Sequence, residues 1–285
     1  MTRQRDPIPV QLVLVPYDTA RRHWGMGSGP AHLINHGLVD GLEAAGHSVN
    51  VSIIDTPGDD IAEVRTAFAL MAGIAATVRD AREAGRFPLV LAGNCNTAVG
   101  TVAGLDYADS IGAFWFDAHG DFNTPDTTVS GVLDGMALAM LTGRCWRALC
   151  RGIPGFGAVR EDSTCLVGAR DLDALEAEAL LGSSVWQVAA AETPHRLAVV
   201  AKEIAARAAA AYLHVDLDVL DSAVGRANRY SVPGGLTAET LLAAIGDVAA
   251  ALPLQAAAIT AYDPAFDTDG SVQKIAARVV HALVK

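Results

Sequence analysis

The sequence predicts an α/β fold of three layers, in which helices cover both faces of a central, mostly parallel, eight-stranded sheet. Short runs rich in β-branched residues alternate along the chain with longer, alanine-rich stretches of helical character. Such alternation is typical of an α/β fold. The short runs are apolar on both faces, as strands are in a parallel sheet that helices cover. Because the chain shows neither an internal repeat nor a linker, we expect one domain over residues 1–285.

Each predicted strand is one of the short β-branched runs. In chain order the strands are Val10–Pro16, Val49–Asp55, Leu89–Gly93, Ile111–Asp117, Cys165–Arg170, Val185–Val188, Tyr212–Val219 and Ala258–Tyr262. Each predicted helix is one of the longer alanine-rich stretches. In chain order the helices are Gly29–Ala45, Ile61–Ala84, Gly135–Trp146, Asp173–Leu181, Pro194–Ala210, Ala238–Ala251 and Ser271–Val284.

The charge and the composition exclude several kinds of partner. The formal net charge is −11 and no segment concentrates Lys and Arg, so we expect neither nucleic acid nor a membrane as a partner. No apolar run approaches the ~20 residues that span a bilayer, and Met1–Pro9 is too short and polar for a signal peptide. The four cysteines lack zinc-knuckle spacing, which favours a reduced, cytoplasmic enzyme.

Polar side chains follow four of the predicted strands, at the point where each strand ends. In an α/β fold, ligands gather at the carboxyl ends of the strands. The four segments are 94–96, 117–121, 171–173 and 216–218, and most of their polar residues are acidic. We therefore expect these segments to form one acidic crater at that edge of the sheet.

Five of these polar residues have the spacing of a metal site. Alternate residues of an extended chain point the same way, which would bring Asp117, His119 and Asp121 to one place. Asp216 and Asp218 repeat this spacing on another strand. Four carboxylates packed together repel one another and are poorly solvated without a cation. Mostly oxygen ligands with one histidine favour two Mn²⁺ ions.

A single Asp-x-His or Asp-x-Asp is more often a turn, a helix cap or a solvated edge than a metal site. Here the apolar runs Phe114–Phe116 and Leu213–Val215 lead directly into the acids. Such runs are typical of buried strands rather than of surface loops. We therefore favour the metal site.

Two segments carry a resemblance to a known family. Phe116–Pro125, which reads FDAHGDFNTP, resembles the second signature of the arginase/agmatinase (ureohydrolase) family, and His214–Asp221, which reads HVDLDVLD, resembles the third. Further similarities follow the family's order across nearly the whole chain, at Gly29–Ala31, Gly168–Asp171 and Tyr262–Pro264. The resemblance implies the arginase-like fold and a binuclear manganese centre.

The resemblance also implies roles for the acids. Asp117 and Asp216 would bridge the two ions, Asp121 would complete the shell of one ion, and His119 and Asp218 that of the other. The implied activity is hydrolysis of a linear C–N bond in a guanidino or amidino compound. Family members commonly assemble as trimers or hexamers, so we expect a homo-oligomer.

The chain departs from the family at one ligand position. Where the family has a histidine in a Gly-Gly-Asp-His-Ser-like segment, this chain reads Ala92–Asn96, with Cys95 at the histidine's place. Cys95 is either a small buried thiol or a thiolate ligand, and its position favours the ligand. A thiolate is softer than imidazole, so it would weaken Mn²⁺ binding there or favour another divalent metal. The family branch that hydrolyses Nω-hydroxyarginine is similar in having a cysteine here.

Two further departures concern the catalytic residues. Asp134 stands where arginases have a histidine thought to shuttle protons; it either does that work or caps the helix that begins near Gly135. We expect Asp121 and Asp134 to be the catalytic residues. The family's guanidinium-binding glutamate is replaced by Ala261. Either the head group of the substrate is neutral or less basic, or Asp263 or Asp134 compensates, or catalysis is reduced.

The residues that would bind the rest of the substrate match the family better. Their positions match those that, in arginases, hold the α-carboxylate and the α-amino group, and together they indicate a free amino acid as substrate. For each residue alone a turn or a cap is an alternative, and Asp173 could cap the helix that follows it. The residues that match the α-carboxylate positions are Asn123, Thr128 and Ser130, and those that match the α-amino positions are Asp171, Asp173 and Glu176.

Two hypotheses follow for the function. The first is a manganese-dependent amidinohydrolase whose best single substrate is Nω-hydroxy-L-arginine, cleaved to hydroxyurea and ornithine. An Nω-hydroxyguanidine is less basic than guanidine, which suits Ala261. The second is a catalytically reduced, non-enzymatic homologue that binds an amino acid, as the replacements at Cys95, Asp134 and Ala261 would allow.

Overall fold

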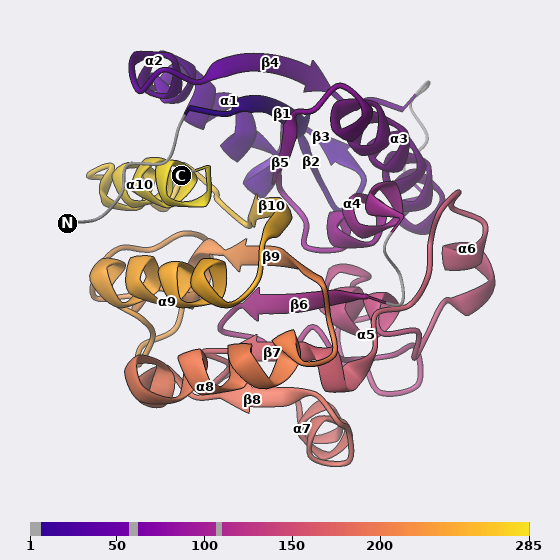
Figure 1. Cartoon of the computed structure of the whole chain (residues 1–285). Helices are drawn as coiled ribbons and strands as arrows, with labels where there is room; N and C mark the ends of the chain where they lie inside the picture. Colours follow the sequence, from indigo (N-terminus) through magenta and orange to yellow (C-terminus); the bar gives the residue numbers. More distant parts are fainter. Residues whose placement is uncertain (1–6, 57–61, 107–109, 285) are drawn as a thin grey trace.

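One sheet of eight strands runs through the middle of the molecule (Figure 1). The computed structural model describes residues 7–56, 62–106 and 110–284. The strands of the sheet are β1 (Pro9–Val15), β4 (Ser48–Ile53), β5 (Phe87–Ala92), β6 (Ile111–Phe116), β7 (Thr164–Val167), β8 (Trp186–Val188), β9 (Ala210–Asp216) and β10 (Leu254–Thr260). Their order is β4-β1-β5-β10-β9-β6-β7-β8, and every pair is parallel. The predicted three-layer fold and all eight predicted strands are confirmed.

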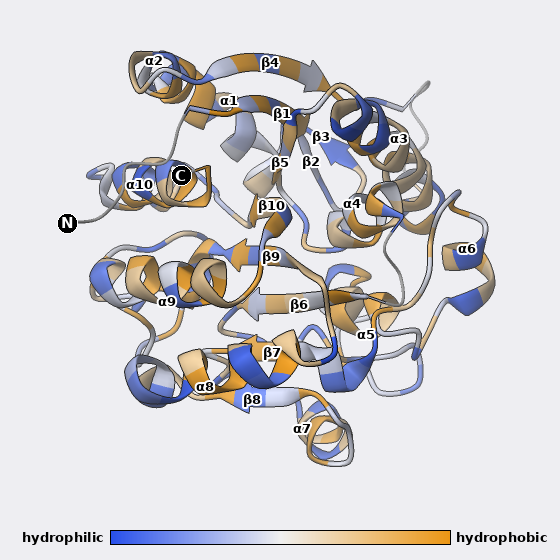
Figure 2. Cartoon of the chain, in the orientation of Figure 1, coloured by the Kyte–Doolittle hydropathy of each residue, from blue (hydrophilic) through white to orange (hydrophobic). Residues whose placement is uncertain are grey.

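Helices cover both faces of this sheet (Figure 1). On one face lie α1 (Gly29–Asn35), α2 (Leu38–Ala44), α8 (Thr193–Ala205), α9 (Ala238–Ala251) and α10 (Ser271–Leu283). On the other lie α3 (Glu63–Glu83), α4 (Thr97–Leu105), α5 (Ala137–Leu141), α6 (Arg147–Arg151) and α7 (Ala174–Leu181). The central strands are hydrophobic along most of their length, whereas the helices carry both polar and apolar residues (Figure 2).

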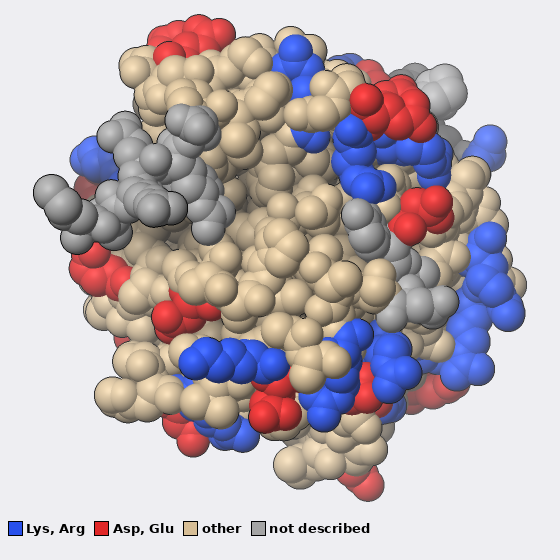
Figure 3. Space-filling view, in the orientation of Figure 1, with Lys and Arg blue, Asp and Glu red and all other residues tan. Residues whose placement is uncertain are grey.

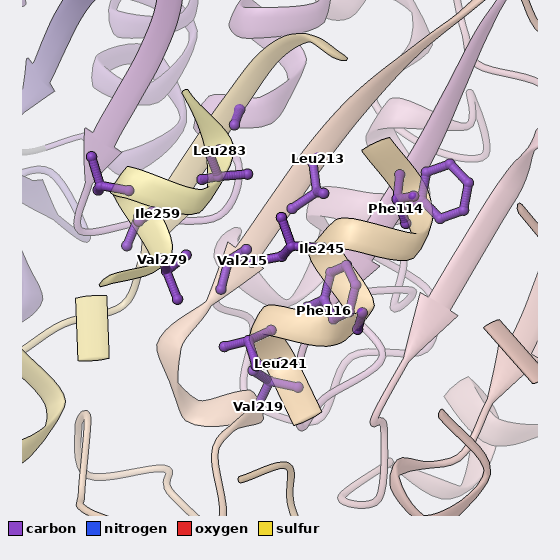
Figure 4. Close-up of a cluster of buried hydrophobic side chains, with 14 of the residues drawn as sticks. Phe114, Phe116, Leu213, Val215, Val219, Leu241, Ile245, Ile259, Val279 and Leu283 are labelled. Atoms are coloured by element: carbon purple, nitrogen blue, oxygen red, sulfur yellow. The ribbon is translucent and has the colours of Figure 1, made fainter. Parts of the chain in front are cut away.

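Alternate residues of the central strands pack into two different hydrophobic clusters. Phe114 and Phe116 of β6 belong to the cluster beneath α9 and α10, whereas Trp115 belongs to the cluster beneath α3, α4 and α5. Figure 4 shows Phe116 beside Leu241 and Ile245 of α9. Since successive side chains of a strand point to opposite faces, this division is what a sheet buried on both sides requires.

Two predicted helices are interrupted in the structure. The helix predicted over Gly29–Ala45 is divided into α1 and α2, because Gly37 between them adopts a left-handed φ of 83°. The helix predicted over Gly135–Trp146 ends at Leu141, and Gly143 (φ 78°) turns the chain before α6 begins. Glycine adopts positive φ without steric cost and so ends helices readily.

Other elements of the structure were not predicted, because their sequences show only a weak pattern of polar and apolar residues. Helix α4 was not predicted because all of its residues are buried, so it lacks the polar face from which a surface helix is recognised. The small antiparallel pair β2 (Tyr17–Asp18) and β3 (Arg21–Arg22) was also missed. Ile61, the first residue of the helix predicted before Ala84, lies outside the described residues.

The surface matches the charge balance of the sequence. On the face seen in Figure 3, Lys and Arg form separate groups interspersed with Asp and Glu, instead of one continuous stripe. Within the described ranges, no helix is both long and apolar enough to cross a bilayer.

Candidate metal centre and substrate cavity

A cavity of about 280 Å³ lies where the carboxyl ends of β5, β10, β9, β6 and β7 meet. These five strands are neighbours in the sheet, so the residues that follow them converge. The cavity is lined by residues of the four predicted segments and, after β10, by Ala261. The structure thus brings the predicted acidic segments together at one edge of the sheet.

Two groups of potential metal ligands lie side by side in this region. The ligand atoms of Cys95, Asp117 and Asp216 all lie within 4.8 Å of one another, and so do those of Asp117, His119 and Asp218. Asp117 belongs to both groups, so the arrangement has the form of two adjacent cation sites that share one carboxylate. Within the first group, Cys95 Sγ lies 3.1 Å from Asp216 Oδ2.

The reason why these residues converge differs from the predicted one. The chain does not stay extended after β6, because it bends at Ala118 and His119 and then adopts a left-handed φ of 47° at Asp121. Similarly, β9 ends at Asp216, and the next three residues, Leu217–Val219, form a 3₁₀ turn. The Asp216 carboxylate accepts a hydrogen bond of 2.8 Å from the Asp218 amide in that turn. Turns, and not strand alternation, therefore bring Asp121 close to Asp117 and Asp218 close to Asp216.

Asp121 provides a test of whether the region fits a cation. Its carboxylate lines the cavity and belongs to neither ligand group, yet its Oδ2 atom is buried and has no hydrogen-bond partner in the described chain. Burial, followed by repulsion from Asp117 and Asp134, raises the pKa of Asp121 well above its usual range. A buried carboxylate oxygen without a partner is costly, and a cation would satisfy it. The oxygen-rich donor set and this orphaned atom both fit divalent metal ions.

The remaining acids interact strongly with one another. Burial and repulsion from Asp218 raise the pKa of Asp216 well above its usual range. Burial alone would raise the pKa of Asp218 too, but hydrogen bonds led by the one from His119 lower it to about 2. The His119 Nδ1 atom lies 3.2 Å from Asp117 Oδ1 and 3.4 Å from Asp218 Oδ2. Burial would lower the pKa of His119, and these two carboxylates raise it instead. Positive charge is therefore strongly favoured in this cluster.

Asp134 also lines the cavity, but its partners are not those of a helix cap. Its Oδ2 accepts a hydrogen bond of 2.7 Å from Asn94 Nδ2, and its Oδ1 accepts one of 3.0 Å from the Asn96 amide. The helix-cap alternative is therefore wrong. Burial raises the pKa of Asp134 to about 7, although both hydrogen bonds oppose the shift. A carboxyl group with this pKa can exchange a proton near neutral pH.

The residues predicted to bind the α-amino group surround another part of the cavity. Asp171, Asp173 and Glu176 all line it. Asp173 and Glu176 also form a capping box at the start of α7, so the cap predicted as an alternative for Asp173 is present. The buried Glu176 carboxylate accepts a hydrogen bond of 2.8 Å from the Phe122 amide. The exposed Asp171 carboxylate lies 4.0 Å from His119 Nε2.

Two of the three residues predicted to bind the α-carboxylate line the cavity, and one does not. Asn123 and Ser130 line the cavity, whereas Thr128 does not. The Thr128 hydroxyl accepts a hydrogen bond of 3.0 Å from the Gly131 amide and lies 3.5 Å from the Ser130 hydroxyl. Asp263, one of the two acids predicted to compensate for Ala261, is not part of the cavity lining either, whereas Asp134 is.

Several cavity residues were not predicted. Asp18, Thr19 and Met26 enter from the segment between β1 and α1, which contains β2 and β3, and Asn228 and Tyr230 enter from the segment between β9 and α9. The side-chain Nδ2 of Asn228 donates hydrogen bonds to Asp218 Oδ2 at 3.1 Å and to the Ala261 carbonyl at 2.8 Å. A polar residue in an irregular loop has no recognisable signal in a single sequence, so only the folded chain reveals these neighbours.

Helices cover both faces of the sheet, and two adjacent groups of potential metal ligands lie at its carboxyl edge. Comparison with known proteins identifies the family. The chain belongs to the arginase family, whose family model matches residues 8–285.

Similar proteins extend over almost the whole chain. The arginase of Bacillus caldovelox is 28% identical over 293 aligned residues, which cover 96% of this chain and 97% of that protein. The crystal structure of arginase from Bacillus cereus has a TM-score of 0.86 at 26% identity, with 97% of this chain and 98% of that chain covered. An arginase structure from Bacillus subtilis has a TM-score of 0.87 at 25% identity, with the same coverage.

Proposed function

We propose that this protein is a manganese-dependent amidinohydrolase that cleaves a linear C–N bond in a guanidino- or amidino-type amino acid. The observation that carries the proposal is the pair of ligand groups that share Asp117 at the cavity. The orphaned Asp121 oxygen beside them supports it. Family membership supports the same class of reaction.

The residues of the chain would divide the work. When bound, two divalent cations would lower the pKa of water and stabilise the charge that develops at the attacked carbon. Cys95, Asp117, His119, Asp121, Asp216 and Asp218 would hold them. Asp134 would hold a proton at its carboxyl group and give it to the departing amine, which its pKa of about 7 permits.

The other cavity residues would orient the amino-acid part of the substrate. Asn123 and Ser130 would donate hydrogen bonds to the α-carboxylate, and Thr128 would act through Ser130. Asp171, Asp173 and Glu176 would surround the α-amino group with negative charge. Holding both ends of a free amino acid would fix the reactive carbon relative to the cations, which accelerates the reaction by positioning.

We propose Nω-hydroxy-L-arginine as the substrate, with water added across the C–N bond to give hydroxyurea and ornithine. Ala261 offers no carboxylate to a strongly basic guanidinium, and an Nω-hydroxyguanidine is less basic. Cys95 at a ligand position supports the same branch of the family. The rival is a homologue without activity, which the same replacements would also produce.

The substrate proposal is tested by assaying the manganese-loaded protein against Nω-hydroxyarginine, arginine, agmatine and formiminoglutamate. We expect Nω-hydroxyarginine to be hydrolysed with the highest kcat/KM. Inactivity toward all four compounds, with metal shown to be bound, would contradict the substrate assignment and would favour the non-enzymatic homologue.

The Asp134→Asn substitution tests the proton-transfer role. If the protonated Asp134 carboxyl serves as the acid, kcat of the unaltered protein should fall as the pH rises through about 7, where that proton is lost. In the variant we expect kcat to be lower by about 10²- to 10⁴-fold and to show no fall in this pH range, with KM changed little. A variant that keeps both the rate and the fall in kcat would exclude Asp134 as the acid.

We further propose a cytoplasmic homo-oligomer, trimer or hexamer. The four cysteines are unpaired and buried, which suits a reducing compartment. Light scattering during gel filtration measures the assembly directly, and a monomeric mass at micromolar concentration would contradict this proposal.

A further inference from the structure

Beneath the candidate metal centre, three buried polar side chains form a hydrogen-bonded chain that ends at Cys95. Tyr212 Oη lies 2.9 Å from His214 Nδ1, and His214 Nε2 lies 3.1 Å from Thr260 Oγ1. The same Thr260 oxygen lies 3.2 Å from Cys95 Sγ. Tyr212, His214 and Thr260 are completely buried. Their strands, β9 and β10, are neighbours in the sheet, so the chain of hydrogen bonds is part of the rigid core.

The direction of these hydrogen bonds follows from the hydrogens available. In the part of the chain that the structure describes, the Tyr212 hydroxyl has one partner, His214 Nδ1. A buried hydroxyl hydrogen without an acceptor is costly, so Tyr212 donates to Nδ1. Among the residues that the structure describes, no carboxylate is hydrogen-bonded to this buried imidazole, which is therefore neutral, with its single hydrogen on Nε2. His214 then donates that hydrogen to Thr260.

The hydroxyl of Thr260 is the last donor in this chain of hydrogen bonds. Since its oxygen accepts from His214, its own hydrogen can be donated either to Cys95 Sγ at 3.2 Å or to the Val215 carbonyl at 3.5 Å. The longer contact lies at the limit of a hydrogen bond to oxygen, whereas 3.2 Å is short for one to the larger sulfur atom. Donation to sulfur is therefore favoured, and it strengthens when the sulfur carries negative charge.

Trp115 fixes this arrangement from the side and connects it to a second metal ligand. Its ring stacks on the imidazole of His214 with 3.7 Å between centroids and 9° between planes. Its Nε1 donates a hydrogen bond of 3.1 Å to Asp117 Oδ2. The two rings lie on paired residues of β6 and β9. The imidazole can therefore neither tilt nor slide without disturbing the carboxylate shared by both ligand groups.

We propose that Tyr212, His214 and Thr260 are positioning residues that hold the Thr260 hydroxyl as a hydrogen-bond donor to the sulfur of Cys95 where that sulfur ligates a divalent cation. This inference rests on the proposed metal site. The donated hydrogen bond orients the sulfur toward Asp117 and Asp216 and withdraws electron density from it. Residues that contact ligands in this way tune both the affinity and the electronic properties of metal sites.

Cobalt(II) is the probe that reports on this bond, because a cobalt–sulfur bond gives a charge-transfer absorption band. We expect the band in the cobalt-loaded protein and its loss in Cys95→Ser. Thr260→Val removes the hydroxyl donor and keeps the shape of the side chain. Because the sulfur then lacks its hydrogen bond, its electrons rise in energy. We expect the band to shift to longer wavelength and cobalt affinity to fall about 10- to 100-fold. Thr260→Ser, which keeps the hydroxyl, should restore both properties.

The outcomes separate this inference from the proposals on which it rests. A band that is identical in the unaltered protein, Thr260→Val and Tyr212→Phe would overturn the inference while leaving Cys95 as a ligand. If the unaltered protein has no band, Cys95 is not a ligand, and both claims fail. A normal band in a protein that hydrolyses none of the four compounds would contradict the substrate alone.

Tyr212→Phe covers the case in which Thr260→Val does not fold. The phenylalanine cannot donate to Nδ1, so the imidazole hydrogen can move to Nδ1 and release Thr260 from its fixed direction. We expect a smaller shift of the band in the same direction, with circular dichroism unchanged. An unshifted band in this folded variant would contradict the proposed direction of the hydrogen bonds.

Discussion

Asp117→Asn is expected to abolish hydrolysis, because Asp117 is the one residue that belongs to both ligand groups. Metal stabilisation of the reacting centre is worth several kcal/mol, and each ~1.4 kcal/mol is a tenfold change in rate. We therefore expect kcat/KM to fall by at least about 1000-fold. Bound manganese, measured by elemental analysis after gel filtration, should fall in parallel.

The same variant distinguishes loss of metal from loss of fold. Burial and repulsion from Asp218 raise the pKa of Asp117, so its ionised form destabilises the metal-free protein at neutral pH. The loss of this charge offsets the loss of hydrogen bonds that Asp117 accepts from Trp115 and His119, so without metal the variant should unfold at a Tm close to that of the unaltered protein. Manganese should raise the Tm of the unaltered protein but not that of the variant. Asp40→Asn, on the exposed part of α2, is the matched control. A variant with normal manganese content would contradict the bridging role.

The double substitution Cys95→His with Ala261→Glu is expected to shift the proposed preference for Nω-hydroxyarginine toward arginine. A carboxylate at position 261 would face a cationic head group in the cavity, and such a buried charge pair is worth about 2–5 kcal/mol. We expect kcat/KM for arginine to rise between about 30- and 4000-fold. Ala261 already holds a left-handed φ of 60° with a Cβ atom, so glutamate introduces no new backbone strain.

Matched variants isolate the charge in this experiment. Glutamine has the shape of glutamate without its charge, so Cys95→His with Ala261→Gln should gain little activity toward arginine. Cys95→His alone measures the contribution of the ligand. If the glutamate and glutamine variants have equal kcat/KM for arginine, the charge at this position does not set substrate choice.

Much of the fold could be predicted because the strands are buried on both faces and therefore appear as continuous apolar runs. β6 is the plainest case, since all six of its residues are buried. Helix boundaries were less predictable where one residue interrupts an otherwise regular pattern. Gly37 divides α1 from α2, yet an isolated glycine inside a helical stretch is a weak signal.

From the strand pattern alone, the candidate site was predictable only where its residues follow strand ends, and the family resemblance supplied further cavity residues such as Asn123, Asp134 and Glu176. Asp117 and Asp216 were predicted on that basis. The left-handed turn at Asp121 and the loop contact between Asn228 and Asp218 depend on tertiary structure. The neighbours of Cys95 depend on strand order, because Thr260 reaches the sulfur only when β10 lies between β5 and β9. A single sequence carries no information about that order.

The proposed binuclear centre is tested most directly by the manganese content of the unaltered protein. Protein reconstituted with Mn²⁺ and freed of loosely held metal should retain about two ions per chain, or about one tightly held and one weaker ion if the Cys95 sulfur disfavours manganese. Activity toward Nω-hydroxyarginine should disappear with chelation and return with Mn²⁺. Fewer than one tightly held ion per chain, with no hydrolysis after Mn²⁺ is added, would contradict the account.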